Sequence, residues 1–247
     1  QTSKFVVITT NSKYECDKLI ICTGGKSYSA TGSNGFGYKI AKKFGHTIIE
    51  PVPALCPIKL KDKWVKSVEG LSLKNVKLSA YSNNKLVKSE FGEMLFTSNG
   101  ISGPIVLTLS SYINRLKNVD LILDFKPALT YETLENRILR EFENNKNSQI
   151  NTVIRSLLPK NLVSIFLSYV KLPESLKVNS ITIEQRKSIV KSLKEFKLNF
   201  DGLYDIDYAI ITSGGVCTKE INPKTMESKI VSNLYFAGEV IDVDALT

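Results

Sequence analysis

Two segments at opposite ends of the chain constrain its fold more than any other feature. Each is a short apolar run followed directly by glycine: Lys18 to Gly25 reads KLIICTGG, and Leu234 to Glu239 reads LYFAGE. Short apolar runs before glycine are typical of buried strands in α/β proteins. Ligands of open α/β sheets bind at the carboxyl ends of such strands. We therefore expect both runs to be strands of one sheet, with a ligand site where they end.

The glycine-rich segment after the first run does not match the standard phosphate-binding patterns. GGKS at Gly24 to Ser27 would need a further glycine five residues before Gly25 to form a P-loop, and Ile20 stands there. GSNGFG, from Gly32 to Gly37, has its glycines at the wrong offsets for the GxGxxG dinucleotide motif. By itself this loop is weak evidence for a ligand site. It indicates such a site only together with the second strand-then-glycine segment.

The order of secondary-structure signals predicts an interrupted α/β domain. Lys4 to Thr10 and Tyr14 to Cys22 indicate a hairpin whose second strand is fully buried. A helix over Tyr38 to Phe44 and a strand over His46 to Glu50 follow. Pro51, Pro53 and Pro57 then indicate a boundary.

The middle of the chain changes from strand signals to helix signals. Alternating apolar patterns dominate from Ala54 to about Phe125. From Thr130, a plausible helix N-cap, apolar residues recur at helical spacing. The three helical stripes are Tyr131, Leu134, Ile138 and Phe142; Leu162, Ile165, Phe166 and Tyr169; and Ile183, Val190, Leu193 and Phe196. Strand signals return at Tyr208 to Thr212.

The predicted fold class is α/β with an α+β insert. The two outer segments form one domain, which a β part and an α part interrupt. The predicted parts are residues 1–53, the first part of the outer domain; 54–128, the β part; 129–198, the α part; and 199–247, the return segment of the outer domain.

Composition narrows the function classes. The net charge of +9 is spread over single and paired lysines, which favours a solvated surface over a nucleic-acid stripe. The cysteines Cys16, Cys22, Cys56 and Cys217 form no CxxC pair, and His46 is the single histidine, expected to cap a turn. These residues support neither a metal site nor a disulfide framework. The absence of a long apolar run leads us to expect a cytoplasmic protein without membrane contact.

Four motifs occur in order along the chain: CTGGKSYSATGSNGFGY from Cys22, GEMLFTSNGISGP from Gly92, SGGVCTKEINPKTMESK from Ser213 and NLYFAGEVIDVDALT from Asn233. Together they resemble the YhiN/BaiN-like family of NAD(P)/FAD-dependent oxidoreductases, the two-dinucleotide-binding flavoproteins, and the resemblance covers essentially the whole chain. It implies that the outer segments form a partial Rossmann-like domain that binds FAD or NAD(P), interrupted by a β-barrel-like subdomain over 54–128 and a helical subdomain over 129–198. FAD is the implied cofactor, and NAD(P)H is a possible reductant.

The resemblance also implies which residues contact the cofactor. Glu239 would lie near the FAD ribitol, and Asp242 is a second candidate. Gly24, Gly25 and Gly238 would let the backbone approach the cofactor, because a Cβ would obstruct it.

Two further groups complete the implied cofactor site. The loop beside the flavin would be formed by Ser27, Tyr28, Thr31 and Gly32. A glycine turn near the ring would be formed by Gly214, Gly215 and Val216. Turns and strand ends without a ligand are the alternative interpretation of both groups. No residue stands out as a catalytic acid or base, and flavin chemistry tolerates this.

The chain departs from the family pattern in two ways. Phe36 stands where the family usually carries an acidic residue. The family's N-terminal GxGxxG segment, which binds the FAD pyrophosphate at a helix N-terminus, has no counterpart here. We therefore expect an internal fragment that by itself binds FAD weakly or not at all and is inactive.

Three hypotheses about function follow. The parent protein is a flavin oxidoreductase that passes hydride from NAD(P)H through FAD to a small organic acceptor. In the second hypothesis, the basic insert is a binding module for nucleic acid or protein, with nucleic acid the less expected partner. In the third, the chain is a cofactor-free truncated product without activity. The acceptor, the choice between NADH and NADPH and the oligomeric state are left open by the sequence.

Overall fold

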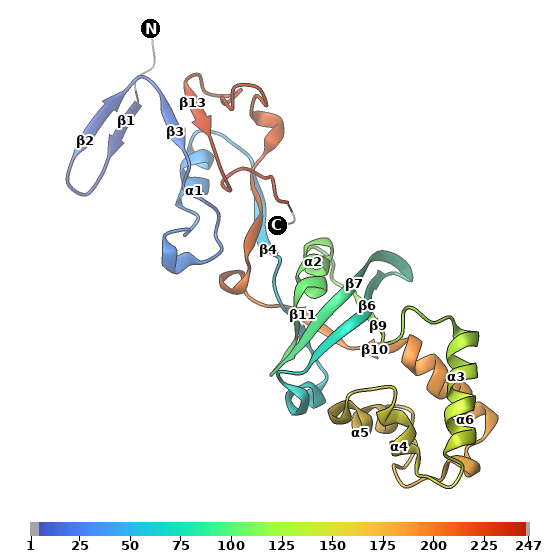
Figure 1. The fold of residues 1–247 in the computed structure, drawn as a ribbon. Helices are drawn as coiled ribbons and strands as arrows, with labels where there is room; N and C mark the ends of the chain where they lie inside the picture. The colour runs from blue at the N-terminus through green and yellow to red at the C-terminus, as the bar shows by residue number, and fades with distance from the viewer. Residues whose placement is uncertain (1–4, 246–247) are drawn as a thin grey trace. The chain divides into compact units, whose positions relative to one another are not determined.

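The computed structural model describes residues 5–245, which divide into two compact units (Figure 1). The first unit combines the chain up to Cys56 with the chain from Tyr204 onward, and the second spans Pro57–Leu203. The second unit holds most of both predicted insert subdomains. No helix in residues 5–245 is both long enough and apolar enough to cross a membrane.

The first unit joins the two ends of the chain through a parallel strand pair. Strand β3 (Leu19–Ile21) pairs with β13 (Leu234–Phe236) in parallel, with Ile20 opposite Tyr235. Leu234 and Phe236 are fully buried, and both lie in the small hydrophobic core of this unit. The expected pairing of the two strand-then-glycine segments is therefore confirmed.

The N-terminal hairpin is shorter than expected. Strands β1 (Phe5–Ile8) and β2 (Lys13–Cys16) pair antiparallel, and β3 is a separate strand rather than the continuation of β2. The second strand of the predicted hairpin, KLIIC, was expected to be fully buried. That prediction is wrong, because Ile20 is 60% exposed and Cys22 is exposed. Alternate side chains of a strand point to opposite faces, and among the described residues only the Ile21 face packs on the core. Lys4 lies outside the described residues.

The expected helix and the strand after it are present with shifted bounds. Helix α1 spans Phe36–Lys43 and begins two residues early, because Asn34 Oδ1 accepts a hydrogen bond of 3.0 Å from the backbone N–H of Phe36. Strand β4 (Ile48–Ala54) follows and pairs antiparallel with β12 (Ile211–Val216).

Strand β4 runs through two of the three prolines that were expected to mark a boundary. Pro51 and Pro53 lie inside it, and the boundary itself is confirmed, because the two compact units divide between Cys56 and Pro57. The sheet of β4 and β12 has two strands, so each strand has an edge without a ladder, and proline is tolerated at such edges.

The second unit is built on a seven-stranded sheet with the hydrogen-bonded order β10-β9-β6-β7-β8-β5-β11. Its strands are β5 (Ile58–Leu60), β6 (Ser72–Ser82), β7 (Lys85–Thr97), β8 (Gly100–Ser102), β9 (Asp120–Asp124), β10 (Phe196–Leu198) and β11 (Phe200–Leu203). The edge strands β10 and β11 are separated in the chain by Asn199 alone. Because consecutive residues are about 3.8 Å apart, the end of β10 lies close to the start of β11, so the sheet curves into a barrel-like form.

Four α-helices enter between the paired strands β9 and β10. They are α3 (Tyr131–Asn144), α4 (Ile150–Arg155), α5 (Lys160–Tyr169) and α6 (Ile183–Lys194). The N-cap prediction is confirmed, since the Thr130 hydroxyl accepts a hydrogen bond from the N–H of Thr133. Phe196 belongs to β10 rather than to the third helical stripe, and α4 was not anticipated. A further helix, α2 (Pro104–Ile113), packs on β7.

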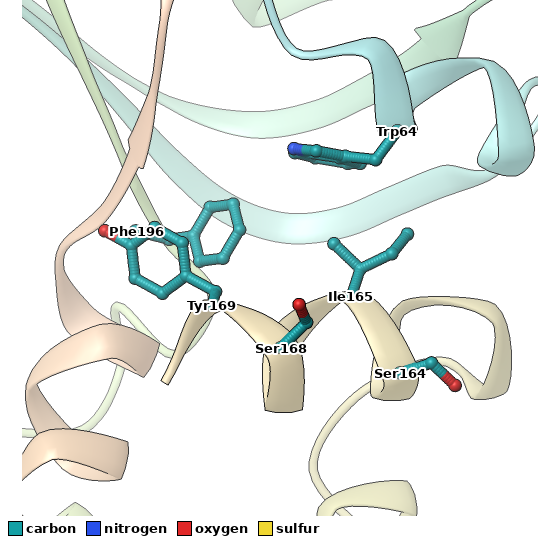
Figure 2. A pocket seen from close by; sticks show the side chains of 6 residues that line it. All are labelled: Trp64, Ser164, Ile165, Ser168, Tyr169 and Phe196. Carbon is teal, nitrogen blue, oxygen red and sulfur yellow. The ribbon is translucent and has the colours of Figure 1, made fainter. Parts of the chain in front are cut away.

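Aromatic rings gather where the helices meet the sheet (Figure 2). Phe196 contacts Trp64 at 5.9 Å, Phe125 at 5.4 Å and Tyr169 at 4.3 Å between ring centroids. Trp64 lies on the 3₁₀ helix η2 (Lys63–Val68). These contacts join η2, β10 and α5.

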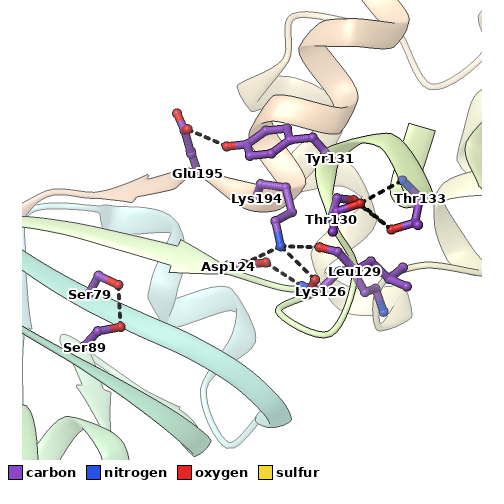
Figure 3. Close-up of polar contacts among 10 residues, drawn as sticks. All are labelled: Ser79, Ser89, Asp124, Lys126, Leu129, Thr130, Tyr131, Thr133, Lys194 and Glu195. Carbon is purple, nitrogen blue, oxygen red and sulfur yellow. Dashed lines mark hydrogen bonds and ion pairs between the residues drawn. The ribbon is translucent and has the colours of Figure 1, made fainter. Parts of the chain in front are cut away.

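A buried ion pair fixes the other side of this junction (Figure 3). At the end of α6, Lys194 Nζ lies 2.7 Å from Asp124 Oδ2 and donates to the carbonyls of Lys126 and Leu129 at 2.9 and 2.7 Å. The Lys194 and Asp124 side chains are 9% and 7% exposed. Because all three acceptors surround one ammonium, the end of β9 and the start of the helical segment are held together.

Candidate functional site

The parallel pairing of β3 and β13 places two glycine-containing loops at the same end of one sheet (Figure 1). Gly24 and Gly25 follow β3, and Gly238 and Glu239 follow β13. Carboxyl ends of parallel strands are the usual ligand-binding edge of an α/β sheet. We take this edge as the candidate site.

The carboxylate of Glu239 connects three segments at this edge. Its Oε2 accepts a hydrogen bond of 3.2 Å from Gly25 N, and its Oε1 accepts one of 2.7 Å from Thr212 N. Ser27 Oγ is a third, longer donor at 3.5 Å from Oε1. Glu239 therefore positions the loop after β3 against the start of β12, a role that the sequence did not indicate.

Thr212 is a second positioning residue, and sequence reasoning missed it. It is buried, and its Oγ1 accepts hydrogen bonds from Lys26 N at 2.8 Å and from Ser27 N at 2.9 Å. These bonds hold the loop after β3 against β12, the strand that carries Thr212. A polar residue inside an otherwise buried strand, directly before Ser213 and a glycine pair, was the available signal.

Two of the three glycines of the candidate site, Gly24 and Gly25, lie in close contact with other protein groups, and the third, Gly238, does not. A Cβ on Gly25 would lie 2.5 Å from Thr212 Oγ1 and 2.8 Å from Glu239 Cδ. A Cβ on Gly24, where φ is +73°, would lie 2.8 Å from Ser33 Oγ. Gly238 has a φ of +77° and open space around its Cβ position. Open space there leaves room for a ligand beside the backbone.

The expectation of a glycine turn at Gly214, Gly215 and Val216 is wrong, because all three lie in strand β12. The pairing with β4 shifts by one residue between Ser213 and Gly215, as in a β-bulge. A Cβ on Gly214 would meet the carbonyl oxygen of Glu50 at 2.5 Å, and one on Gly215 that of Val240 at 2.6 Å. Close packing against other backbone segments, β4 for Gly214 and the turn at Val240 for Gly215, accounts for both glycines.

The remaining loop residues lie at the surface. Tyr28, Thr31 and Gly32 are exposed. Thr31 ends a short 3₁₀ helix, η1 (Ser29–Thr31), which Tyr28 and Gly32 flank. Thr31 Oγ1 donates a hydrogen bond of 2.8 Å to the carbonyl of Tyr28. Asp242 is half-buried, and its N–H donates to the carbonyl of Val216 at 3.0 Å.

Tyr38 contributes an unpaired polar group to the site. This side chain on α1 is buried, and its hydroxyl has no hydrogen-bond partner among the described residues. Burial, together with the negative charges of Glu239 and Asp242, raises the pKa of Tyr38 to about 12. A neutral phenol without a partner is a hydrogen-bond donor for a ligand. This residue was not predicted as part of the site.

His46 closes the last turn of α1 as expected, because its N–H donates a hydrogen bond of 3.0 Å to the carbonyl of Ala41. It is buried, its Nε2 shares a hydrogen bond of 2.8 Å with Ser228 Oγ, and its Nδ1 lies 3.2 Å from Glu220 Oε2. The Ser228 hydroxyl also accepts hydrogen bonds from the N–H groups of Ile230 and Val231. Because this hydroxyl is buried and serves as a turn acceptor, the arrangement stabilises the fold rather than forming a nucleophile.

Residues 5–245 contain no group of three or more His, Cys, Asp or Glu side chains that could hold a metal ion. Cys56 is buried, Cys16 and Cys217 are half-buried, and Cys22 is exposed at the end of β3.

Comparison with known proteins identifies the family. The HI0933-like family, described as the HI0933-like protein barrel and H2TH domain, matches residues 52–211. That range contains the curved sheet and the inserted helices described above.

Three curated relatives extend the similarity over nearly the whole chain. The ribosomal RNA dihydrouridine synthase of Haemophilus influenzae is 34% identical over 97% of this chain and 58% of its own length. The Escherichia coli protein of the same name is 31% identical over 92% of this chain and 55% of its own length. The 3-dehydro-bile acid delta(4,6)-reductase of Clostridium scindens is 26% identical over 98% of this chain and 60% of its own length.

The chain thus spans somewhat more than half the length of the curated relatives that it matches. The resemblance found in the four sequence motifs is confirmed at the level of the family. This chain belongs to the HI0933-like family, within the FAD-dependent oxidoreductase superfamily.

Proposed function

We propose that this chain forms the ribityl and flavin-ring side of an FAD site in a reductase that saturates a carbon–carbon double bond of RNA uridine. One observation carries the cofactor part of this proposal. The loops after β3 and β13 meet at one sheet edge, where Glu239 and Thr212 hold them in place. The FAD-dependent superfamily to which the family belongs supports the same assignment.

The residues at this edge suit a dinucleotide cofactor. Gly238, whose Cβ position faces open space, would let the cofactor approach the backbone, and the Tyr38 hydroxyl would donate a hydrogen bond to one of the cofactor's oxygen atoms. A carboxylate has about four acceptor positions, so Glu239 can accept one more hydrogen bond, from a ribityl hydroxyl. FAD, when bound, supplies the hydride-transfer chemistry. NAD(P)H is the proposed reductant.

RNA is favoured as the acceptor by the relatives' names and by charge. The relatives that are 34% and 31% identical are named for ribosomal RNA dihydrouridine synthesis. The net charge of +9 suits a polyanionic substrate. This proposal departs from the small organic acceptor expected from the sequence. That acceptor stays the second candidate, supported by the bile acid reductase at 26% identity.

The cofactor assignment is tested by substituting Glu239 and titrating FAD. Glu239→Ala should weaken FAD binding about 5- to 150-fold, since leaving hydrogen-bond groups unpaired costs about 1 to 3 kcal/mol. Asp244→Ala is the matched control, because it removes an exposed carboxylate of the same segment. Flavin fluorescence measures the affinity in both the 247-residue chain and a chain extended to the relatives' length. Equal affinities for the two variants would contradict the assignment.

The acceptor is tested separately with the extended protein. Unmodified ribosomal RNA and NAD(P)H are incubated with it, and mass spectrometry looks for uridine that has gained two hydrogen atoms. In the net reaction NAD(P)H supplies a hydride and solvent a proton, and the uridine double bond takes up both. Turnover of a steroid dienone without turnover of RNA would favour the second candidate.

A further inference from the structure

We infer that a cavity in the second unit binds a single unstacked nucleobase of RNA. The inference deepens the RNA part of the proposed function and rests on it. The cavity has a volume of about 350 Å³ and is lined by Trp64, Ser164, Ile165, Ser168, Tyr169 and Phe196. This volume falls in the range of roughly 300 to 1,000 Å³ that is usual for small-molecule sites.

The shape of the cavity suits a flat ring. Figure 2 shows the Trp64 indole on one side and Ile165 and Ser168 of α5 on the other, with Tyr169 and Phe196 at one end. The indole is held by edge contacts with Phe96 at 5.6 Å and with Phe196 at 5.9 Å. Because these contacts fix the plane of the indole, a base can stack on it at little cost in side-chain entropy.

The cavity is open to solvent and has both apolar and polar groups. Tyr169 is 42% exposed although its ring packs on Phe196 at 4.3 Å, and Trp64 is half-buried. The hydroxyl-bearing residues Ser164 and Ser168 are exposed on α5. Bases of single-stranded RNA are recognised in this way, by stacking on aromatic rings and hydrogen bonding along their edges.

The chain around Trp64 is basic, which favours an anionic ligand over a neutral one. The stretch KLKDKWVK around Trp64 carries four lysines, Lys59, Lys61, Lys63 and Lys66. Its single carboxylate, Asp62, accepts hydrogen bonds from Asn199 N and Nδ2 at 2.7 and 2.8 Å. Lysines next to an aromatic stacking surface are the combination that binds the backbone and bases of single-stranded nucleic acids.

The inference is tested by the fluorescence of Trp64, the one tryptophan of the chain. The full 247-residue chain is titrated with a uridine-rich single-stranded RNA of about ten nucleotides, within the range of known single-strand sites. We expect quenching of Trp64 emission on binding. Inorganic polyphosphate should compete for the lysines without causing this quenching, because it has no ring to stack.

Two matched variants separate the cavity from the rest of the surface. Ser168→Phe places a ring in the cavity while leaving the aromatic packing intact, and should weaken RNA binding about 5- to 150-fold. Asn161→Phe adds the same ring to an exposed position of α5 outside the lining and should leave the affinity unchanged. Circular dichroism and the unfolding midpoint show whether each variant is folded as the original chain is.

RNA binding without quenching, with equal affinities for Ser168→Phe and Asn161→Phe, would overturn the cavity assignment. That outcome would leave the proposed reductase untouched, because RNA would still bind. Conversely, failure to reduce uridine while RNA binding still depends on Ser168 would overturn the proposed reaction and retain the base site. Absence of RNA binding at low salt would overturn the inference.

Discussion

Replacing Thr212 by valine tests whether the loop after β3 is held as the structure indicates. Valine keeps the shape of threonine but removes Oγ1, the acceptor for Lys26 N and Ser27 N at 2.8 and 2.9 Å. The hydrogen bond from Thr212 N to Glu239 at 2.7 Å is made by the backbone and persists. The substitution therefore isolates two hydrogen bonds.

The magnitude follows from the burial of the two donors. The bond from Ser27 N is buried, and leaving such a donor unpaired costs about 1 to 3 kcal/mol. The bond from Lys26 N is part-buried, so water replaces some of it and about 1 kcal/mol is lost. We expect a total of about 2 to 4 kcal/mol. If FAD binding must restore the loop, each 1.4 kcal/mol lowers the affinity about tenfold.

Hydrogen exchange measured by mass spectrometry checks this prediction directly. Peptides that cover Gly25 to Tyr28 should exchange much faster in Thr212→Val than in the original chain, and FAD titration should show the loss of affinity. Thr212→Ser is the control, because it keeps the hydroxyl and should behave like threonine. Unchanged exchange in the valine variant would refute the role of Thr212, whatever happens to FAD binding.

Three further predictions concern stability, pH dependence and FAD binding. Lys194→Met leaves the buried Asp124 charge unpaired and should cost about 3 to 5 kcal/mol in urea unfolding followed by tryptophan fluorescence, so a loss below about 1 kcal/mol would contradict the ion pair. Burial alone would raise the pKa of Glu220, but hydrogen bonds from Thr47 lower it below its usual value of 4.5 in the folded chain. The ionised Glu220 carboxylate therefore stabilises the fold above pH 4.5, and this stabilisation is lost as the pH falls through the pKa of the folded chain. Thermal melting across that range should show a shift that Glu220→Gln abolishes. Tyr38→Phe should leave the unfolding free energy nearly unchanged yet weaken FAD binding, and unchanged FAD binding would exclude Tyr38 as a ligand contact.

The sequence determined the features that depend on nearby residues. Helical spacing predicted α3 and α5, and Thr130 was recognisable as an N-cap because its partner, Thr133, is three residues away. The two strand-then-glycine runs predicted that the ends of the chain would pair, and β3 and β13 do so. The motifs around them were sufficient to indicate the family.

Only the tertiary structure decided which groups meet at the site. Gly25 and Glu239 are 214 residues apart, and Thr212 and Glu239 are 27 apart. Hydrogen bonds of this kind leave no periodic signal, because they depend on where whole strands are placed rather than on the preferences of neighbouring residues. The same reason explains why the burial of Tyr38 and the pairing of His46 with Ser228 could not be predicted. The preferences of neighbouring residues determined the helices and strands, and the packing of segments far apart in the sequence determined which polar groups lie next to one another.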